Sequence, residues 1–202
     1  MATGSSAKWL NIPSEKKYLG YGVSACATCD GFFYRGRTVA VIGGGNSAVS
    51  EALNLATLAD KVVLVHRRHQ LRADKILQDK IFNNKKIVVE WDSVVEEIVG
   101  EDNPLKVTGI KIKNVENDKL KTIPVDGVFV AVGHQPNTDI FKGNLVLDSK
   151  GYIVTHENCS ATDIEGVFAA GDVKDPKYKQ AVISAGSGAM AAMDAIEYLD
   201  VE

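Results

Sequence analysis

The chain has 202 residues, of which 45% are hydrophobic, so it can bury a core as one large domain or two small ones. Its 23 basic and 26 acidic residues leave a formal net charge of -3, which provides no general field for nucleic acid or an anionic membrane. No apolar run reaches the roughly 18 to 20 residues of a membrane span, and the N-terminus does not resemble a secretion signal. We therefore expect a globular, cytoplasmic protein without nucleic-acid or membrane partners.

A glycine-rich turn lies between a predicted strand and a predicted helix. Residues 38–42 form an apolar run, residues 43–45 are glycines, and apolar residues then recur at helical spacing from Ala48 to Ala56. A second apolar run covers residues 62–65, which completes one βαβ unit, and a further helix is expected over residues 73–82.

The pattern changes to strands over residues 87–125, with a turn at 116–118, which predicts an inserted antiparallel meander. Residues 127–133 are continuously apolar apart from their glycines, as buried parallel strands are.

A new region is expected after residue 134. It contains a predicted hairpin over residues 145–154, a short strand over 166–170 and a closing helix over about 180–199. The fold class is therefore α/β, with domains predicted at residues 1–9, 10–134 and 135–202.

The glycine turn fits the dinucleotide-binding pattern G-x-G-x-x-A. In that pattern the first glycine permits the tight turn, the second admits a pyrophosphate, and a small third residue lets the helix pack closely. The alternative is a glycine turn that serves only geometry. The candidate ligand residues are Gly43, Gly44, Gly45, Asn46, Ser47 and Ala48.

Basic residues follow the second strand, where an NAD-binding unit usually carries an acidic residue against the ribose. His66, Arg67 and Arg68 stand there, with Arg72 one turn further on. Guanidinium groups suit a 2′-phosphate, so NADPH is favoured over NADH. A solvated basic cluster is the alternative.

Cys26 and Cys29 form a C-x-x-C pair, followed directly by Asp30. This spacing can close a small disulfide ring, and Asp30 could relay a proton as a thiolate forms or leaves. The alternatives are two unreactive buried cysteines, or half of a zinc site completed by His156 and Cys159.

With C-A-T-C-D-G, G-G-G-N-S-A, H-R-R and G-V-F-A-A-G-D-V in this order, the chain resembles the low-molecular-weight thioredoxin reductases. The resemblance implies a Rossmann-like NADPH-binding domain joined to the C-terminal part of a second, FAD-binding one. It implies that Cys29 faces the flavin, that Cys26 attacks thioredoxin, and that the domains rotate at hinges near Asn11 and Gln135. It further implies FAD contacts by Thr3, Gly4, Gly171, Asp172, Lys179, Gln180 and Ala181, although Lys179 stands where arginine is frequent.

The family usually begins with an FAD-binding segment that carries its own glycine loop, and no such loop precedes Cys26. Residues 2–7 are similar to the end of that segment, a tag remnant being the alternative. We therefore expect a truncated thioredoxin-disulfide reductase, a homodimer in its full-length form, which alone binds NADPH but retains FAD poorly and is inactive.

Two other functions are the alternatives to a thioredoxin reductase. One is the flavoprotein reductase of a peroxiredoxin system, which differs by an additional N-terminal thioredoxin-like domain. The other is a non-catalytic NADPH-binding module, against which the cysteine pair argues.

Overall fold

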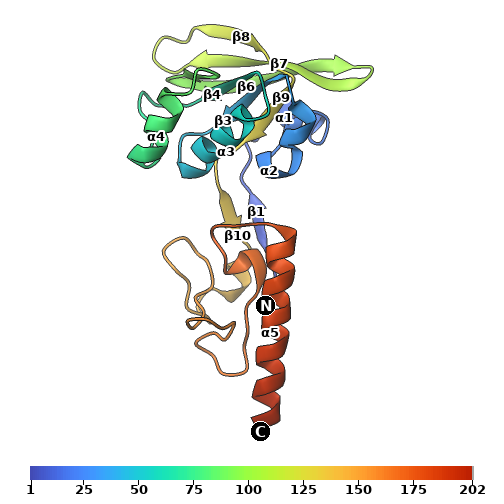
Figure 1. Cartoon of the computed structure of the whole chain (residues 1–202), viewed down its shortest axis with the longest axis vertical. Helices are drawn as coiled ribbons and strands as arrows, with labels where there is room; N and C mark the ends of the chain where they lie inside the picture. The colour runs from blue at the N-terminus through green and yellow to red at the C-terminus, as the bar shows by residue number, and fades with distance from the viewer. Residues whose placement is uncertain (202) are drawn as a thin grey trace. The chain divides into compact units, whose positions relative to one another are not determined.

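The structure, a computed structural model, describes residues 1–201. Its contacts divide the chain into two compact units (Figure 1). Unit 2 is Lys8–Gly133, and unit 1 combines Met1–Ala7 with the chain from His134 onward. The domain changes predicted from the sequence lie after residues 9 and 134.

Unit 2 is built on a five-stranded sheet in which every neighbouring pair of strands runs parallel. In sheet order the strands are β2 (Val23–Ser24), β9 (Gly127–Val130), β3 (Thr38–Ile42), β4 (Lys61–Val65) and β5 (Ile87–Glu90). These strands are apolar on both faces because both faces are covered.

Successive side chains of β3 enter two different cores, as the alternation of a strand requires. Val39 and Val41 belong to one buried cluster, whereas Ala40 and Ile42 belong to the other. The sheet is therefore the middle layer of three.

Helices cover the first face, and an antiparallel meander covers the second (Figure 1). Leu55 is fully buried in the helical layer and Ile110 in the meander layer. The helices are α2 (Ala27–Asp30), α3 (Asn46–Ala56) and α4 (Lys75–Phe82); the meander is β6 (Ser93–Asp102), β7 (Leu105–Asn114) and β8 (Leu120–Pro124), with α1 (Pro13–Tyr18) packed against it. The 3-10 helix η1 (Gly31–Tyr34) directly follows α2.

The predicted α/β class is confirmed, but the meander begins later than predicted. β5 pairs in parallel with β4, so it is the edge strand of the central sheet. The antiparallel ladder starts only at Ser93. A short apolar strand has the same local pattern in a parallel sheet and in an antiparallel meander, because its partner strand is set by contacts far away in the sequence.

Unit 1 contains an antiparallel pair, β1 (Ser5–Ala7) with β10 (His134–Pro136). The 3-10 helices η2 (Asp139–Phe141) and η3 (Gly171–Val173) follow, and α5 (Ala181–Val201) is the closing helix. No helix among residues 1–201 has the length and apolarity to cross a bilayer.

The predicted hairpin over residues 145–154 forms with a single antiparallel bridge, whereas the strand predicted over residues 166–170 does not form. The segments around residues 145–154 and 166–170 form only isolated bridges, Leu147 with Ile153 and Ala161 with Phe168. In the hairpin, the N–H of Asp148 donates to Tyr152 and that of Val154 donates to Val146. The backbone of residues 166–170 bonds to scattered partners instead: the N–H of Ala169 donates to Ser160, and that of Ala170 donates to Met1. A continuous ladder therefore does not form.

Candidate nucleotide and redox sites

Gly43 leaves β3 with a φ of +149°, a conformation that favours glycine. A Cβ there would lie 2.5 Å from the carbonyl oxygen of Ala131 and 2.7 Å from the Cβ of Ala48. Gly43 and Ala48 must therefore both be small, so that the start of α3 can pack close to the sheet.

The two following glycines are constrained differently. A Cβ on Gly44 would lie 2.3 Å from the imidazole ring of His66, so this position is closed by the protein itself. A Cβ on Gly45 would meet no atom within 4 Å. Gly45 therefore leaves open space at the beginning of α3, where the first-turn N–H groups have no partner within the helix.

Hydrogen bonds fix the arginine-bearing segment against this loop. The N–H of Arg72 donates to the carbonyl of Gly44 at 2.7 Å. The amide of Asn46 donates to the carboxylate of Asp74 and accepts from the N–H of Asp74, both at 2.8 Å. The position of Arg72 is thus tied to the glycine turn.

His66 lies under the loop and is 4% exposed. Burial lowers its pKa, a backbone hydrogen bond with Gln70 opposes this, and Arg72, Arg68 and Arg67 lower it further. Its Nε2 lies 3.0 Å from the carbonyl oxygen of Gln70. The ring is therefore neutral at pH 7, with Nε2–H directed at that carbonyl.

A cavity of about 570 Å³ opens over the loop, entirely within unit 2. Arg67, Arg72 and Lys8 are among its lining residues, and none of the lining residues is acidic. Five of the predicted loop residues line it, namely Gly43, Gly44, Gly45, Asn46 and Ser47. Arg68 and Ala48 do not, since Ala48 faces Gly43 instead.

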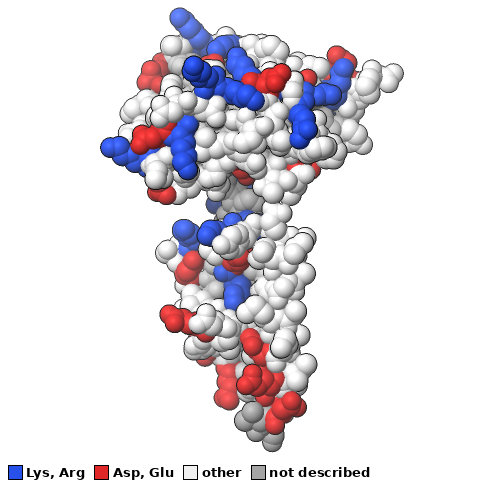
Figure 2. Space-filling view, in the orientation of Figure 1, with Lys and Arg blue, Asp and Glu red and all other residues white. Residues whose placement is uncertain are grey.

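A second cavity, of about 780 Å³, lies in unit 1 and has the opposite charge. Its lining includes Asp163, Glu165, Asp194 and Glu197. Figure 2 shows acidic side chains gathered where α5 ends. Such a lining disfavours a phosphate-bearing ligand, so the smaller, basic cavity is the candidate nucleotide site.

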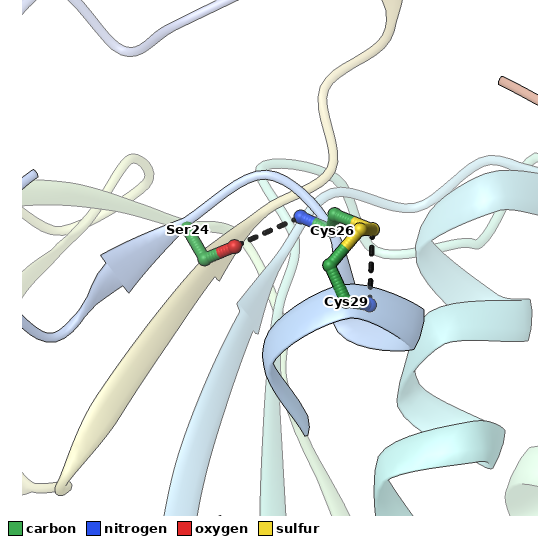
Figure 3. Close-up of a disulfide and its surroundings, with 3 residues drawn as sticks. All are labelled: Ser24, Cys26 and Cys29. Carbon is green, nitrogen blue, oxygen red and sulfur yellow. Dashed lines mark hydrogen bonds between the residues drawn. A yellow bond between two sulfur atoms is a disulfide. The ribbon is translucent and has the colours of Figure 1, made fainter. Parts of the chain in front are cut away.

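Cys26 and Cys29 are joined in a disulfide, with their Cα atoms 5.3 Å apart (Figure 3). The N–H of Cys26 donates to Ser24 Oγ at 3.0 Å, and that of Cys29 donates to Cys26 Sγ at 3.1 Å. Cys26 is half-buried and Cys29 exposed. The pair therefore lies in an ordered turn in which Cys29 is the more exposed residue.

Asp30, the third predicted catalytic residue, ends α2 and is half-buried. Its charge acts on Tyr34, whose pKa is raised first by burial and then by Asp30.

Glu51, on α3, was not predicted as a site residue. Burial raises its pKa to about 7, against the opposing effect of a backbone hydrogen bond from Ala27. Its Oε2 is buried and has no hydrogen-bond partner in the described chain. Ala27 lies between the two cysteines, so the carboxyl of Glu51 contacts the backbone of the C-x-x-C turn. A glutamate beside Ser50 on an amphipathic helix gives no sequence signal for such a role.

The predicted flavin contacts all lie in unit 1. Thr3 Oγ1 donates to the carbonyl of Asn137 at 2.7 Å, and Asp172 accepts from Ser184 at 2.9 Å and from Ser5 at 3.3 Å. Gly4 and Gly171 have φ values of +70° and +74°. Lys179 Nζ lies 4.9 Å from the ring centre of Tyr152, Gln180 precedes α5, and Ala181 begins it.

His134, on β10, is a titratable residue near Lys179 and Asp172. It was not predicted as a site residue. Burial lowers its pKa, Lys179 lowers it further, and Asp172 opposes the shift. Its position after a buried strand was the only signal available.

No group of three or more His, Cys, Asp or Glu side chains in residues 1–201 is arranged to hold a metal. Cys159 is a free, half-buried thiol, and His156 Nε2 lies 3.0 Å from the carbonyl oxygen of Thr162.

The family model of the pyridine nucleotide-disulphide oxidoreductases matches residues 1–188. The chain belongs to this family. Within it, the predicted resemblance to thioredoxin reductases is confirmed: the thioredoxin reductase of Rickettsia conorii is 54% identical over 200 residues, which span 99% of this chain and 64% of the relative. The solved structure of thioredoxin reductase from Streptococcus pyogenes is 44% identical, with a TM-score of 0.92, over 100% of this chain and 65% of that one.

A relative from Pseudomonas fluorescens carries a different name, glucosaminate ammonia-lyase. It is 51% identical over 209 residues, which span 99% of this chain and 63% of the relative. The chain thus spans about 64% of the length of the curated relatives that it matches.

Proposed function

We propose that the chain carries the NADPH site and the redox disulfide of a cytoplasmic, homodimeric thioredoxin-disulfide reductase. The observation that carries the proposal is the presence, in one unit, of a basic, acid-free cavity over a dinucleotide turn and of a C-x-x-C disulfide. The relatives named thioredoxin reductase support it.

NADPH fits the cavity by its chemistry. The open position at Gly45 and the first-turn N–H groups of α3 suit the pyrophosphate, while Arg67 and Arg72 suit the 2′-phosphate. Neutral His66 supports the turn without adding charge. Arg68 stands outside the lining and contributes a longer-range field.

FAD, when bound, supplies the chemistry that accepts a hydride from NADPH and hands two electrons to a disulfide. The unit 1 residues fit such a group because Gly4 leaves open space in a backbone conformation that favours glycine. Asp172, held by Ser5 and Ser184, would bind the ribityl chain, with Thr3, Gly171 and Lys179 beside it. Gln180 and Ala181 would approach the isoalloxazine ring.

The dithiol then works by exchange. The Cys26 thiolate attacks one sulfur of the substrate disulfide and releases the other as a thiolate, which takes a proton with the help of Asp30. Cys29 next attacks the Cys26 sulfur, so that the Cys26–Cys29 disulfide forms again and the reduced substrate leaves. Thioredoxin is the proposed substrate.

The cofactor assignment is tested by binding NADPH and NADH to Arg67→Ala, Arg72→Ala and Arg68→Ala variants. Loss of one charged hydrogen bond, worth about 1.5 to 3 kcal/mol, should weaken NADPH binding about tenfold to a hundredfold for the two lining arginines. NADH binding should barely change, and Arg68→Ala should have the smallest effect. An unchanged NADPH preference in Arg67→Ala and Arg72→Ala would refute the assignment.

The substrate is tested with reduced chain and oxidised thioredoxin or a peroxiredoxin disulfide. Faster exchange with thioredoxin supports the proposal, whereas faster exchange with the peroxiredoxin supports the alternative reductase. Ammonia release from glucosaminate, tested in parallel, is not expected, because the cysteine pair serves disulfide chemistry.

A further inference from the structure

Glu51 is a half-buried acid on α3, and its Oε2 atom is fully buried. α3 packs against α2 at this point, and the carboxyl of Glu51 receives a hydrogen bond from the backbone of Ala27. Ala27 itself is buried at 2% exposure and directly follows Cys26. Glu51 therefore accepts from the first residue of α2, which lies between the two cysteines.

One of the two oxygens of this carboxyl lacks a hydrogen bond within residues 1–201. Its Oε2 is buried without a hydrogen-bond partner in the part of the chain that the structure describes. An ionised carboxylate in that position loses solvation that one backbone N–H does not replace, so the neutral acid is favoured.

Charged groups on the surrounding elements do not account for this state. Burial is the main cause of the raised pKa of Glu51, and the Ala27 hydrogen bond is the one opposing cause. The ionisable side chains on the elements packed against α3 are Asp30 on α2, Lys75, Asp79 and Lys80 on α4, Lys61 on β4 and Glu90 on β5. None of them is among the causes. The protonation state of Glu51 in the oxidised chain is therefore set by burial and by the Ala27 hydrogen bond.

We propose that Glu51 is a positioning residue for the redox pair: it anchors the turn through Ala27 and takes up a proton when a thiolate forms there. Reduction breaks the S–S bond and places two electrons on the two sulfurs, while the reductant is oxidised. A sulfur that remains a thiolate adds negative charge to the turn that Glu51 contacts through Ala27, so protonation of Glu51 becomes more favourable. Reduction of Cys26–Cys29 is then coupled to proton uptake by Glu51.

This inference rests on the proposed redox role of the pair, but its test needs neither NADPH, flavin nor thioredoxin. The whole chain is reduced with excess dithiothreitol, freed of reductant, and alkylated with iodoacetamide over a range of pH. Cys159→Ser is present in every variant, because Cys159 is the remaining free thiol. Mass spectrometry assigns the reaction to Cys26 or Cys29.

Glu51→Gln keeps an oxygen that can accept from Ala27 but carries neither charge nor titratable proton. At about pH 8 it should raise the alkylation rate of the more reactive cysteine about two- to threefold, since its thiol pKa falls by about half a unit to one unit from an ordinary value of about 8.5. At about pH 6 the two rates should converge, because wild-type Glu51 is then mostly protonated. Asp79→Asn, which removes an exposed carboxylate from α4, is the matched control and should leave both rates unchanged.

Identical pH profiles in the parent chain and Glu51→Gln, or an equal shift in Asp79→Asn, would overturn the proposal. A second measurement holds even if Glu51→Gln fails to fold. With carbon-13-labelled glutamate, the Glu51 carboxyl should titrate near pH 7 in the oxidised chain and at higher pH in the reduced one. The same pKa in both states would also overturn it. If the Glu51 pKa shifts on reduction but the protein does not turn over thioredoxin, the proposed function is contradicted and the inference about Glu51 is not.

Discussion

At the scale of single residues, a methyl group added at Gly44 should affect mainly stability, whereas one added at Gly45 should affect mainly nucleotide binding. Gly45→Ala should change the free energy of unfolding by less than about 1 kcal/mol, since no protein atom opposes the new Cβ and the backbone is extended. It should nevertheless weaken NADPH binding by about tenfold or more, because the methyl group occupies the space left for the pyrophosphate. Isothermal titration and urea unfolding measure the two effects.

Gly44→Ala is the complementary variant. Its Cβ would overlap the His66 ring, so overpacking should destabilise unit 2 by about 1 to 3 kcal/mol. Equal losses of stability in both variants would contradict the distinction between the two glycines.

The raised pKa of Glu51 makes stability depend on pH. Its pKa is about 7 in the folded chain, against an ordinary value of 4.5. The contribution of the protonated carboxyl is complete below pH 4.5 and is lost as the pH rises through about 7. Glu51→Gln, which stays neutral, should therefore gain about 2 to 3 kcal/mol relative to wild type between about pH 5 and pH 8.

Urea unfolding followed by tryptophan fluorescence measures this difference, because both tryptophans, Trp9 and Trp91, belong to unit 2. A difference between the two proteins that is the same at both pH values would contradict the expectation.

The residues of the candidate site were predictable to the extent that their chemistry is local. The glycine turn, Arg67 and the cysteine pair each carry a short motif, so the sequence located them. Glu51 has no motif, since its role depends on α3 packing against α2. Likewise, only the fold distinguishes Arg72, which lines the cavity, from Arg68, which does not.

At the scale of elements, α1 depends on one buried acid. Glu15 is 2% exposed and accepts from the N–H groups of Leu10 at 2.8 Å and Asn11 at 2.9 Å. Asn11 has a φ of +61°, so this bend needs support. Glu15→Ala should destabilise unit 2 by about 1 to 3 kcal/mol, because two part-buried backbone donors lose their acceptor.

Glu15→Gln, which keeps one acceptor oxygen, should lose about half as much. Chemical unfolding of the two variants checks the ranking, and an equal loss in both would show that the carboxylate geometry is not what supports the bend.

At this scale, the sequence predicted the strands of the βαβ unit but not every strand pairing. The runs at 38–42 and 62–65 were found because a helix of matching period follows the first and the whole forms a βαβ unit. The place of β5 depends on β4, a strand that precedes α4 in the chain, lying alongside it. Local pattern does not contain that information.

At the scale of the whole molecule, the two units should respond to different ligands. NADPH at about a hundred times its dissociation constant should stabilise unit 2 by about 2.7 kcal/mol, seen as a rise in the tryptophan-detected unfolding midpoint. FAD should leave that midpoint unchanged. A shift produced by FAD and not by NADPH would reverse the assignment of the units.

The chain by itself is expected to retain flavin poorly. On α5, Val182 is 82% exposed, Met193 69% and Leu199 65%, so the helix offers an apolar face that packs on little within unit 1. The purified chain should therefore show flavin absorbance far below one flavin per chain. A stoichiometric yellow protein would contradict this expectation.

The backbone hydrogen bond from Lys8 to Gly133, 2.9 Å long, joins the first and last residues of unit 2. The unit is therefore an insertion whose two ends already meet, and β1 and β10 can pair only after the intervening chain has brought them together. During synthesis, β1 cannot pair with β10 until residues 134–136 have been made. For the same reason, unit 2 is the portion that protein engineers could excise, transplant or circularly permute with the least disturbance to its own backbone.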